Sequence, residues 1–112
     1  MATVTGADIP STLRVNGAML SQFVGKSVVL PGRLISNDGQ RITVEAADNN
    51  NVNVILNQQL PVDARFLEIT GVVEPDMSVQ MTSVSTWPDT VDMELLNDTI
   101  RFQFEYSHLF QS

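Results

Sequence analysis

The side chains that could do chemistry in this sequence are few and scattered. None of the 112 residues is a cysteine, which excludes a thiolate nucleophile, a disulfide and a zinc-thiolate site. His108 is the only histidine, and it lies on the polar side of its segment, where we expect it to be solvated. No glycine-rich phosphate loop and no Gly-x-Ser-x-Gly motif is present. The sequence therefore predicts a protein that is not an enzyme, with no catalytic residue, cofactor, metal ion or small-molecule substrate.

One polar run, Asp48-Asn49-Asn50-Asn51, offers the oxygen ligands that calcium prefers. It lacks the central glycine and the terminal bidentate glutamate of a calcium-binding loop. We interpret this run as a turn between two strands.

Single-stranded nucleic acid is the other ligand to consider, because proteins that bind it combine cationic side chains with stacking aromatic rings. Arg33, Arg41 and Phe66 are the residues that could face such a ligand. The chain has only six Lys plus Arg against thirteen Asp plus Glu, for a net charge of −7, and no two cations are adjacent. Because phosphate contacts rely on clustered positive charge, we expect any direct contact with DNA to be weak.

Five segments with the alternation of β-strands must position these residues. The expected strands are residues 27–36, 41–47, 52–56, 66–74 and 78–84. Gly32 in the first strand suits a sharp bend, and Asp38-Gly39 is a strong hairpin signal. The connection at residues 57–65, which we expect to include one helical turn, separates three strands from two.

This grouping predicts a mainly β fold, a five-stranded OB-type barrel. A five-strand sheet sandwich fits the same pattern. Before the barrel, Asn16 is a good N-cap for a short helix that ends at Gly25. The loops that flank the ligand groove of such a barrel are short here, and they carry Asp38, Glu74 and Asp76.

The last segment predicts a helix from about Asp92 to Ser107, after Trp87-Pro88. Its apolar residues form two neighbouring stripes that merge into an arc of roughly 220°. The first stripe is Val91, Leu95, Phe102, Tyr106 and Leu109, and the second is Met93, Leu96, Ile100 and Phe104. A helix docked on its own domain needs an apolar stripe of about 100°. We therefore expect part of this arc to contact a partner; the alternative is a helix sunk into the open end of its own barrel.

The organisation that follows is an arm at 1–15, a barrel at 16–88 and an oligomerisation helix at 89–112. No apolar run approaches the about 20 residues that span a bilayer, so no membrane association is expected. Residues 1–10 have neither a basic start nor an apolar stretch, so we expect no secretory signal.

Three strings in the sequence resemble one family. They are NGAMLSQFVGKSVVLPGRL at residues 16–34, ITGVV at 69–73 and VDMELLNDTIR at 91–101. Over about residues 13–110 the chain is similar to the smallest subunit of eukaryotic replication protein A.

The resemblance implies an OB fold whose terminal helix joins one helix from each of the middle and large subunits in a parallel three-helix bundle. It also implies a nuclear protein that assembles a heterotrimer for DNA replication, repair and recombination, while its partners hold most of the single-stranded DNA. By this resemblance Leu95, Leu96, Ile100 and Phe104 are central to the bundle, with Phe102 and Tyr106 beside them.

Our first hypothesis is therefore an assembly subunit that binds its partners through the terminal helix. The candidate partner-binding residues are Val91, Met93, Leu95, Leu96, Ile100, Phe102, Phe104 and Tyr106. The second hypothesis is an autonomous single-strand binder that uses Arg33, Arg41 and Phe66. The third is a small OB subunit of another assembly, such as a telomere-capping complex.

Overall fold

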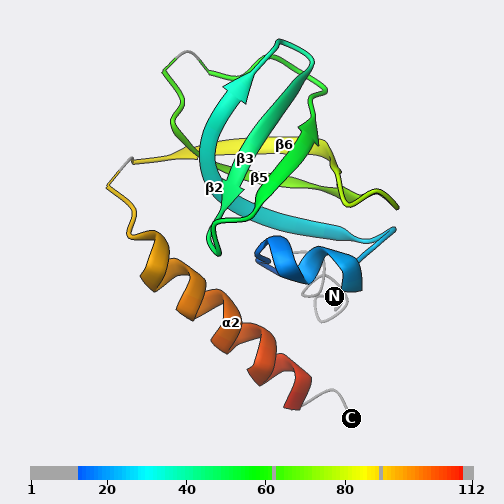
Figure 1. The fold of residues 1–112 in the computed structure, drawn as a ribbon, viewed down its shortest axis with the longest axis vertical. Coiled ribbons are helices and arrows are strands. Elements are labelled where there is room, and N and C mark those ends of the chain that lie inside the picture. The colour runs from blue at the N-terminus through cyan, green and yellow to red at the C-terminus, as the bar shows by residue number, and fades with distance from the viewer. Residues whose placement is uncertain (1–12, 62, 89, 110–112) are drawn as a thin grey trace, which may run out of the picture.

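The computed structural model describes residues 13–61, 63–88 and 90–109, and only the backbone for 107–109. Most of the expected N-terminal arm lies outside the described residues. The elements in chain order are η2 (Gly17–Gln22), β2 (Ser27–Asn37), β3 (Arg41–Ala46), β4 (Asn51–Ile55), β5 (Phe66–Val73), β6 (Val79–Trp87) and α2 (Met93–Leu109). The strands close into a barrel, and η2 and α2 lie together at one end of it (Figure 1). The predicted five-stranded barrel with a short N-terminal helix and a C-terminal helix is confirmed.

Strand β2 belongs to both halves of the barrel. It pairs with β5 over Ser27–Arg33 and with β3 over Gly32–Asn37, so Gly32 lies where the strand changes partner. A Cβ at this position would stand 2.5 Å from the Glu45 carbonyl oxygen, closer than real Cβ atoms approach. Glycine is therefore required by the close approach of β3 at the bend.

The ring closes through a short parallel contact between β4 and β6. Val54 pairs with Val79 and Ile55 with Gln80, whereas every other strand pair is antiparallel and longer. The strand order is β2-β3-β4-β6-β5, returning to β2. This closure encloses a single apolar interior.

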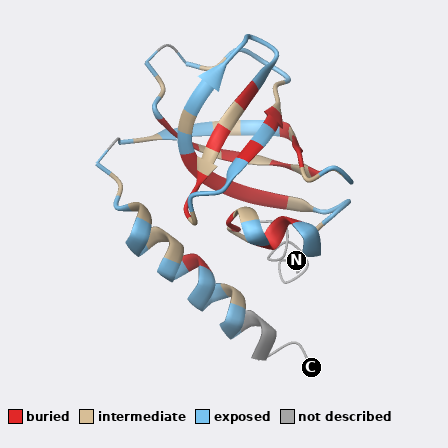
Figure 2. Cartoon of the chain, viewed as in Figure 1, coloured by how far each residue is buried: buried red, intermediate tan, exposed pale blue. Residues whose placement is uncertain are grey.

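The core fills the barrel and continues toward η2 and α2. Figure 2 shows the buried residues concentrated on the strands and η2, with one buried turn on α2. The largest fully buried side chains are Leu20, Leu30, Ile42, Leu67, Ile69, Met81 and Ile100. Residues from η2 and α2 therefore share one core with the strands.

Three local features differ from the sequence-based expectation. The short helix has 3-10 geometry, and Asn16 caps it as predicted. Strand β6 runs on to Trp87 because Trp87 pairs with Phe66 at the start of β5. The described residues of 56–65 hold no helical turn; Asp63 has φ 67°, which breaks a right-handed helical backbone.

Candidate partner-binding face of the C-terminal helix

Helix α2 begins with an acidic cap at Asp92, close to the start that the sequence predicts. The Leu95 amide donates to the Asp92 carboxylate at 3.1 Å, and the Leu96 amide donates to the Asp92 carbonyl at 3.0 Å. The carboxylate satisfies an otherwise orphan N–H and lies favourably at the positive end of the helix dipole. Asp92 therefore fixes where the helix starts after the chain leaves β6.

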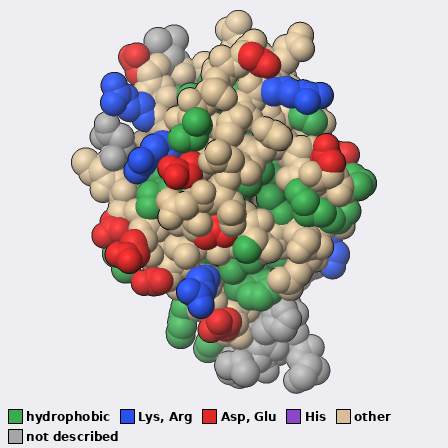
Figure 3. All heavy atoms as spheres, viewed as in Figure 1, with side chains coloured by type: hydrophobic (Ala, Val, Ile, Leu, Met, Phe, Trp, Pro, Cys, Tyr) green, Lys and Arg blue, Asp and Glu red, His purple; other side chains and the backbone are tan. Residues whose placement is uncertain are grey.

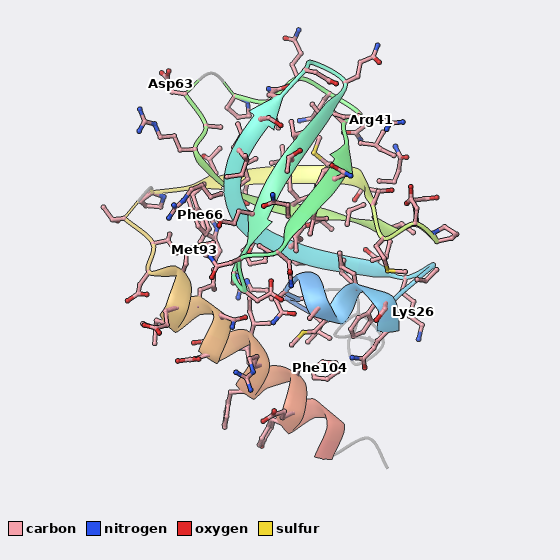
Figure 4. All side chains as sticks on the ribbon, viewed as in Figure 1. Lys26, Arg41, Asp63, Phe66, Met93 and Phe104 are labelled. Atoms are coloured by element: carbon pink, nitrogen blue, oxygen red, sulfur yellow. The ribbon has the colours of Figure 1, made fainter. Side chains whose placement is uncertain are left out.

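One face of α2, which we call the inner face, packs on the barrel and η2. Ile100 is fully buried in the shared core, and Leu96 and Phe104 pack against that core while partly exposed. The Phe104 ring meets Phe23 edge-on, with ring centroids 6.0 Å apart and planes at 75°. Phe104 lies on the side of α2 that faces η2 (Figure 4). Part of the apolar arc is thus covered by the chain itself.

A polar contact fixes the rotation of the helix on this surface. The buried Asn16 accepts from the Met19 amide at 3.2 Å through Oδ1, so its Nδ2 is left to donate to Asn97 Oδ1 at 2.8 Å. Both polar atoms of the Asn16 side chain therefore have a partner, and the bond to Asn97 links α2 to the residue that caps η2.

Asp48 connects the β3–β4 turn to η2. Its carboxylate accepts from the amides of Gly17 and Ala18, both at 3.0 Å. The interpretation of residues 48–51 as a turn agrees with this geometry. Across the described ranges no three His, Cys, Asp or Glu side chains are grouped so that they could hold a metal ion.

The opposite face of α2, the outer face, is exposed although it is apolar. Leu95 is 64% exposed, Phe102 67% and Tyr106 55%. The Phe102 and Tyr106 rings stack on each other, with centroids 6.1 Å apart. The Thr99 hydroxyl lies between them and Leu95 and donates to the Leu95 carbonyl at 3.0 Å. These four residues, here called the outer stripe, form a continuous strip along the helix.

The eight residues predicted to bind a partner are therefore divided between two surfaces. Leu95, Phe102 and Tyr106 lie on the outer stripe, whereas Leu96, Ile100 and Phe104 face the barrel and η2. Val91 and Met93 are partly exposed where the helix begins. The first group is the most exposed of the three in this conformation.

The three residues expected to face nucleic acid do not form one site. Arg33 and Arg41 are exposed, but Phe66 is only 2% exposed. Phe66 stacks on Trp87 with centroids 5.7 Å apart, so its ring offers no free face to a base. Figure 4 shows Phe66 and Arg41 well apart on the barrel.

Trp87 is the residue that sequence reasoning missed. Besides covering Phe66, its ring lies 5.4 Å from the Arg14 guanidinium, which also forms an ion pair with Glu68 at 2.6 Å. Trp87 follows an alternating segment, and this position could have indicated that it extends the strand. An aromatic pair across neighbouring strands, such as Trp87 with Phe66, stabilises a sheet.

Arg41 lies next to acidic turns. It lines two neighbouring hollows of about 280 and 560 Å³ with mainly polar side chains. Amide donors from Arg41 and Gln40 lower the pKa of the Asp38 carboxyl, and the Ser78 hydroxyl and amide lower the pKa of the Asp76 carboxyl. Hydrogen bonds to the charged form keep both carboxylates ionised. Of these two carboxylates, Asp38 lines the smaller hollow together with Arg41, so negative charge lies beside this cation.

Comparison with known proteins identifies the family. The family model described as Replication factor A protein 3 matches residues 8–110. The chain belongs to this family. Replication factor A protein 3 of Schizosaccharomyces pombe is 27% identical over 99 residues, covering 88% of this chain and 94% of that protein. A 14 kDa subunit of replication protein A from Arabidopsis thaliana is 26% identical over 97 residues, covering 86% of this chain and 91% of that protein.

Two solved structures resemble the chain, and the first supports the replication factor A protein 3 assignment. A chain of U. maydis replication protein A bound to ssDNA superposes with a TM-score of 0.81 at 25% identity, covering 90% of this chain and 96% of that one. The telomere capping protein Ten1 of S. pombe has a TM-score of 0.69 at 11% identity, covering 84% and 98%. The second similarity shows the shared fold alone.

Membership of the replication factor A protein 3 family assigns this chain no catalytic role. Among the helices of the described residues, none has the length and apolar character to cross a membrane.

Proposed function

We propose that this chain is the assembly subunit of a replication protein A heterotrimer that binds single-stranded DNA in replication, repair and recombination. Its terminal helix joins one helix from each of the middle and large subunits, and the complex works in the nucleus. The exposed outer stripe carries this proposal, because it is a large apolar surface on a helix that is already docked on its inner face.

The spacing of the outer stripe fits a helical bundle. Its residues, Leu95, Thr99, Phe102 and Tyr106, are separated by four, three and four positions. That alternation keeps side chains on one seam of a coiled coil. Covering large apolar side chains contributes about 1.5 to 3 kcal/mol each before association costs. Neighbouring helices are therefore the partner that this surface suits best.

The DNA-binding role belongs mainly to the partners in this proposal. Phe66 is buried beneath Trp87, and Arg41 lies beside the ionised Asp38. Stacking rings and clustered cations are the two contributions that single-strand binding requires. An autonomous single-strand binder therefore has less support than an assembly subunit.

A double substitution on the outer stripe tests the proposal. Leu95→Asp with Phe102→Asp, co-expressed with the middle and large subunits from the same organism, is expected to be lost from the purified complex. Both side chains are exposed, so the isolated variant should keep the wild-type circular dichroism spectrum.

A matched control places the same two charges elsewhere. Gln58 and Gln59 are exposed in the β4–β5 connection, so Gln58→Asp with Gln59→Asp should assemble at the wild-type yield. Wild-type recovery of the complex with the outer-stripe variant would refute the proposal.

A further inference from the structure

The two edges of the outer stripe carry different charge. If Leu95 and Phe102 take the d positions of a heptad repeat, Asp98 and Glu105 both fall at g positions. The e positions on the other edge are Leu96 and Gln103, which carry no charge. One edge of the seam is therefore acidic and the other is neutral.

The acidic edge is available to a partner. Asp98 and Glu105 are exposed, and Glu94 lies on the same side one turn before Asp98. Figure 3 shows acidic side chains gathered along the border of the molecule that α2 forms. Arg101 is the only cation in this row, and within the described residues no ion pair joins it to either carboxylate. Negative charge remains in excess along this edge.

We propose that the helix packed against this edge presents Lys or Arg opposite Asp98 and Glu105. The inference rests on the proposed function, since it concerns the bundle formed on the outer stripe. Charges at e and g positions select partners by attraction, and by repulsion of like charges. The acidic edge thus selects which of the two partner helices lies on that side of the outer stripe.

A competition experiment tests this charge selection. Wild-type chain and an Asp98→Asn, Glu105→Gln variant with a different tag are co-expressed with limiting amounts of the middle and large subunits. The variant loses two exposed ion pairs with the partner helix. At low salt the purified complex should therefore contain roughly 2- to 30-fold less variant than wild-type chain. The difference should shrink at high salt, because screening weakens exposed pairs.

Two controls separate this inference from the proposed function. Gln58→Lys with Gln59→Lys changes net charge by the same amount away from α2 and should compete like wild type. Equal or better incorporation of the Asp98→Asn, Glu105→Gln variant, with the Leu95→Asp, Phe102→Asp variant still excluded, overturns the charge selection alone. Incorporation of both variants at the wild-type level overturns the proposed function as well.

Discussion

The inner and outer faces of α2 are similar in sequence and opposite in environment. Ile100 on the inner face has no exposed surface, whereas Phe102, two residues along, is 67% exposed. Both faces have large apolar side chains at helical spacing. The width of an apolar arc thus indicates how much surface must be covered, but not which molecule covers it.

The inner face also carries a specific polar contact with the start of η2. Asn97 accepts from the buried Asn16, which ties α2 to η2 in one orientation. That orientation turns Phe102 away from the barrel. The docking of one face therefore presents the other, and substitutions on the two faces should act on different equilibria.

The largest effect on folding is expected from Ile100→Ala. Removing a fully buried aliphatic side chain typically lowers the free energy of unfolding by about 2 to 5 kcal/mol, because a cavity remains. Urea denaturation followed by Trp87 fluorescence measures the change. Ile100→Val is the control, with an expected cost of about 0.5 to 1.5 kcal/mol. A negligible effect of Ile100→Ala would mean that α2 is not docked in the isolated chain.

A smaller loss, about 1 to 3 kcal/mol, is expected from Phe104→Ala. The ring is only partly buried, yet its edge-on contact with Phe23 adds to its burial. Phe104→Leu keeps most of the apolar surface and removes the ring pair, so it should recover part of the loss. Thermal unfolding of the three proteins checks this order, which a Leu variant as unstable as the Ala variant would contradict.

Asn97→Ala is expected to lower the free energy of unfolding by about 1 to 3 kcal/mol. The substitution removes the acceptor for Asn16 Nδ2. A buried donor without a partner has given up its hydrogen bonds to water and gains none from the protein, which destabilises the folded state. Asn97→Asp retains an acceptor oxygen and should restore most of the stability. Chemical denaturation measures the free energy of unfolding of the two variants. Equal values for the Ala and Asp variants would show that the hydrogen bond does not hold the helix.

Much of the fold was predictable because local patterns specify it. Alternation located the five strands, Gly32 marked the bend of β2, and Asn16 and Asp92 marked the starts of the two helices. These signals depend on neighbours in sequence. Element boundaries were least certain where tertiary pairing decides them, as at Trp87, whose strand is extended by pairing with Phe66.

The candidate site was predictable only as a whole helix. No periodicity distinguishes Ile100 from Phe102 as the residue that enters the core, since both are large and apolar. The choice depends on contacts between residues far apart in the chain, such as Asn16 with Asn97 and Phe23 with Phe104. For the same reason the sequence offered Phe66 as a stacking platform, although the fold covers it with Trp87.

The smallest effect on the isolated chain is expected from Phe102→Ala, within about 0.5 kcal/mol of wild type, because exposed side chains contribute little to folding. Urea denaturation beside Ile100→Ala makes the comparison direct. In the assembled complex the order should reverse, since Phe102 would then be at the centre of a buried seam and its truncation should weaken assembly. If Phe102→Ala instead destabilised the isolated chain as strongly as Ile100→Ala, the outer stripe would already be covered within this protein or by a second copy of it. Concentration dependence of the melting temperature separates those two explanations, because only association between copies depends on concentration.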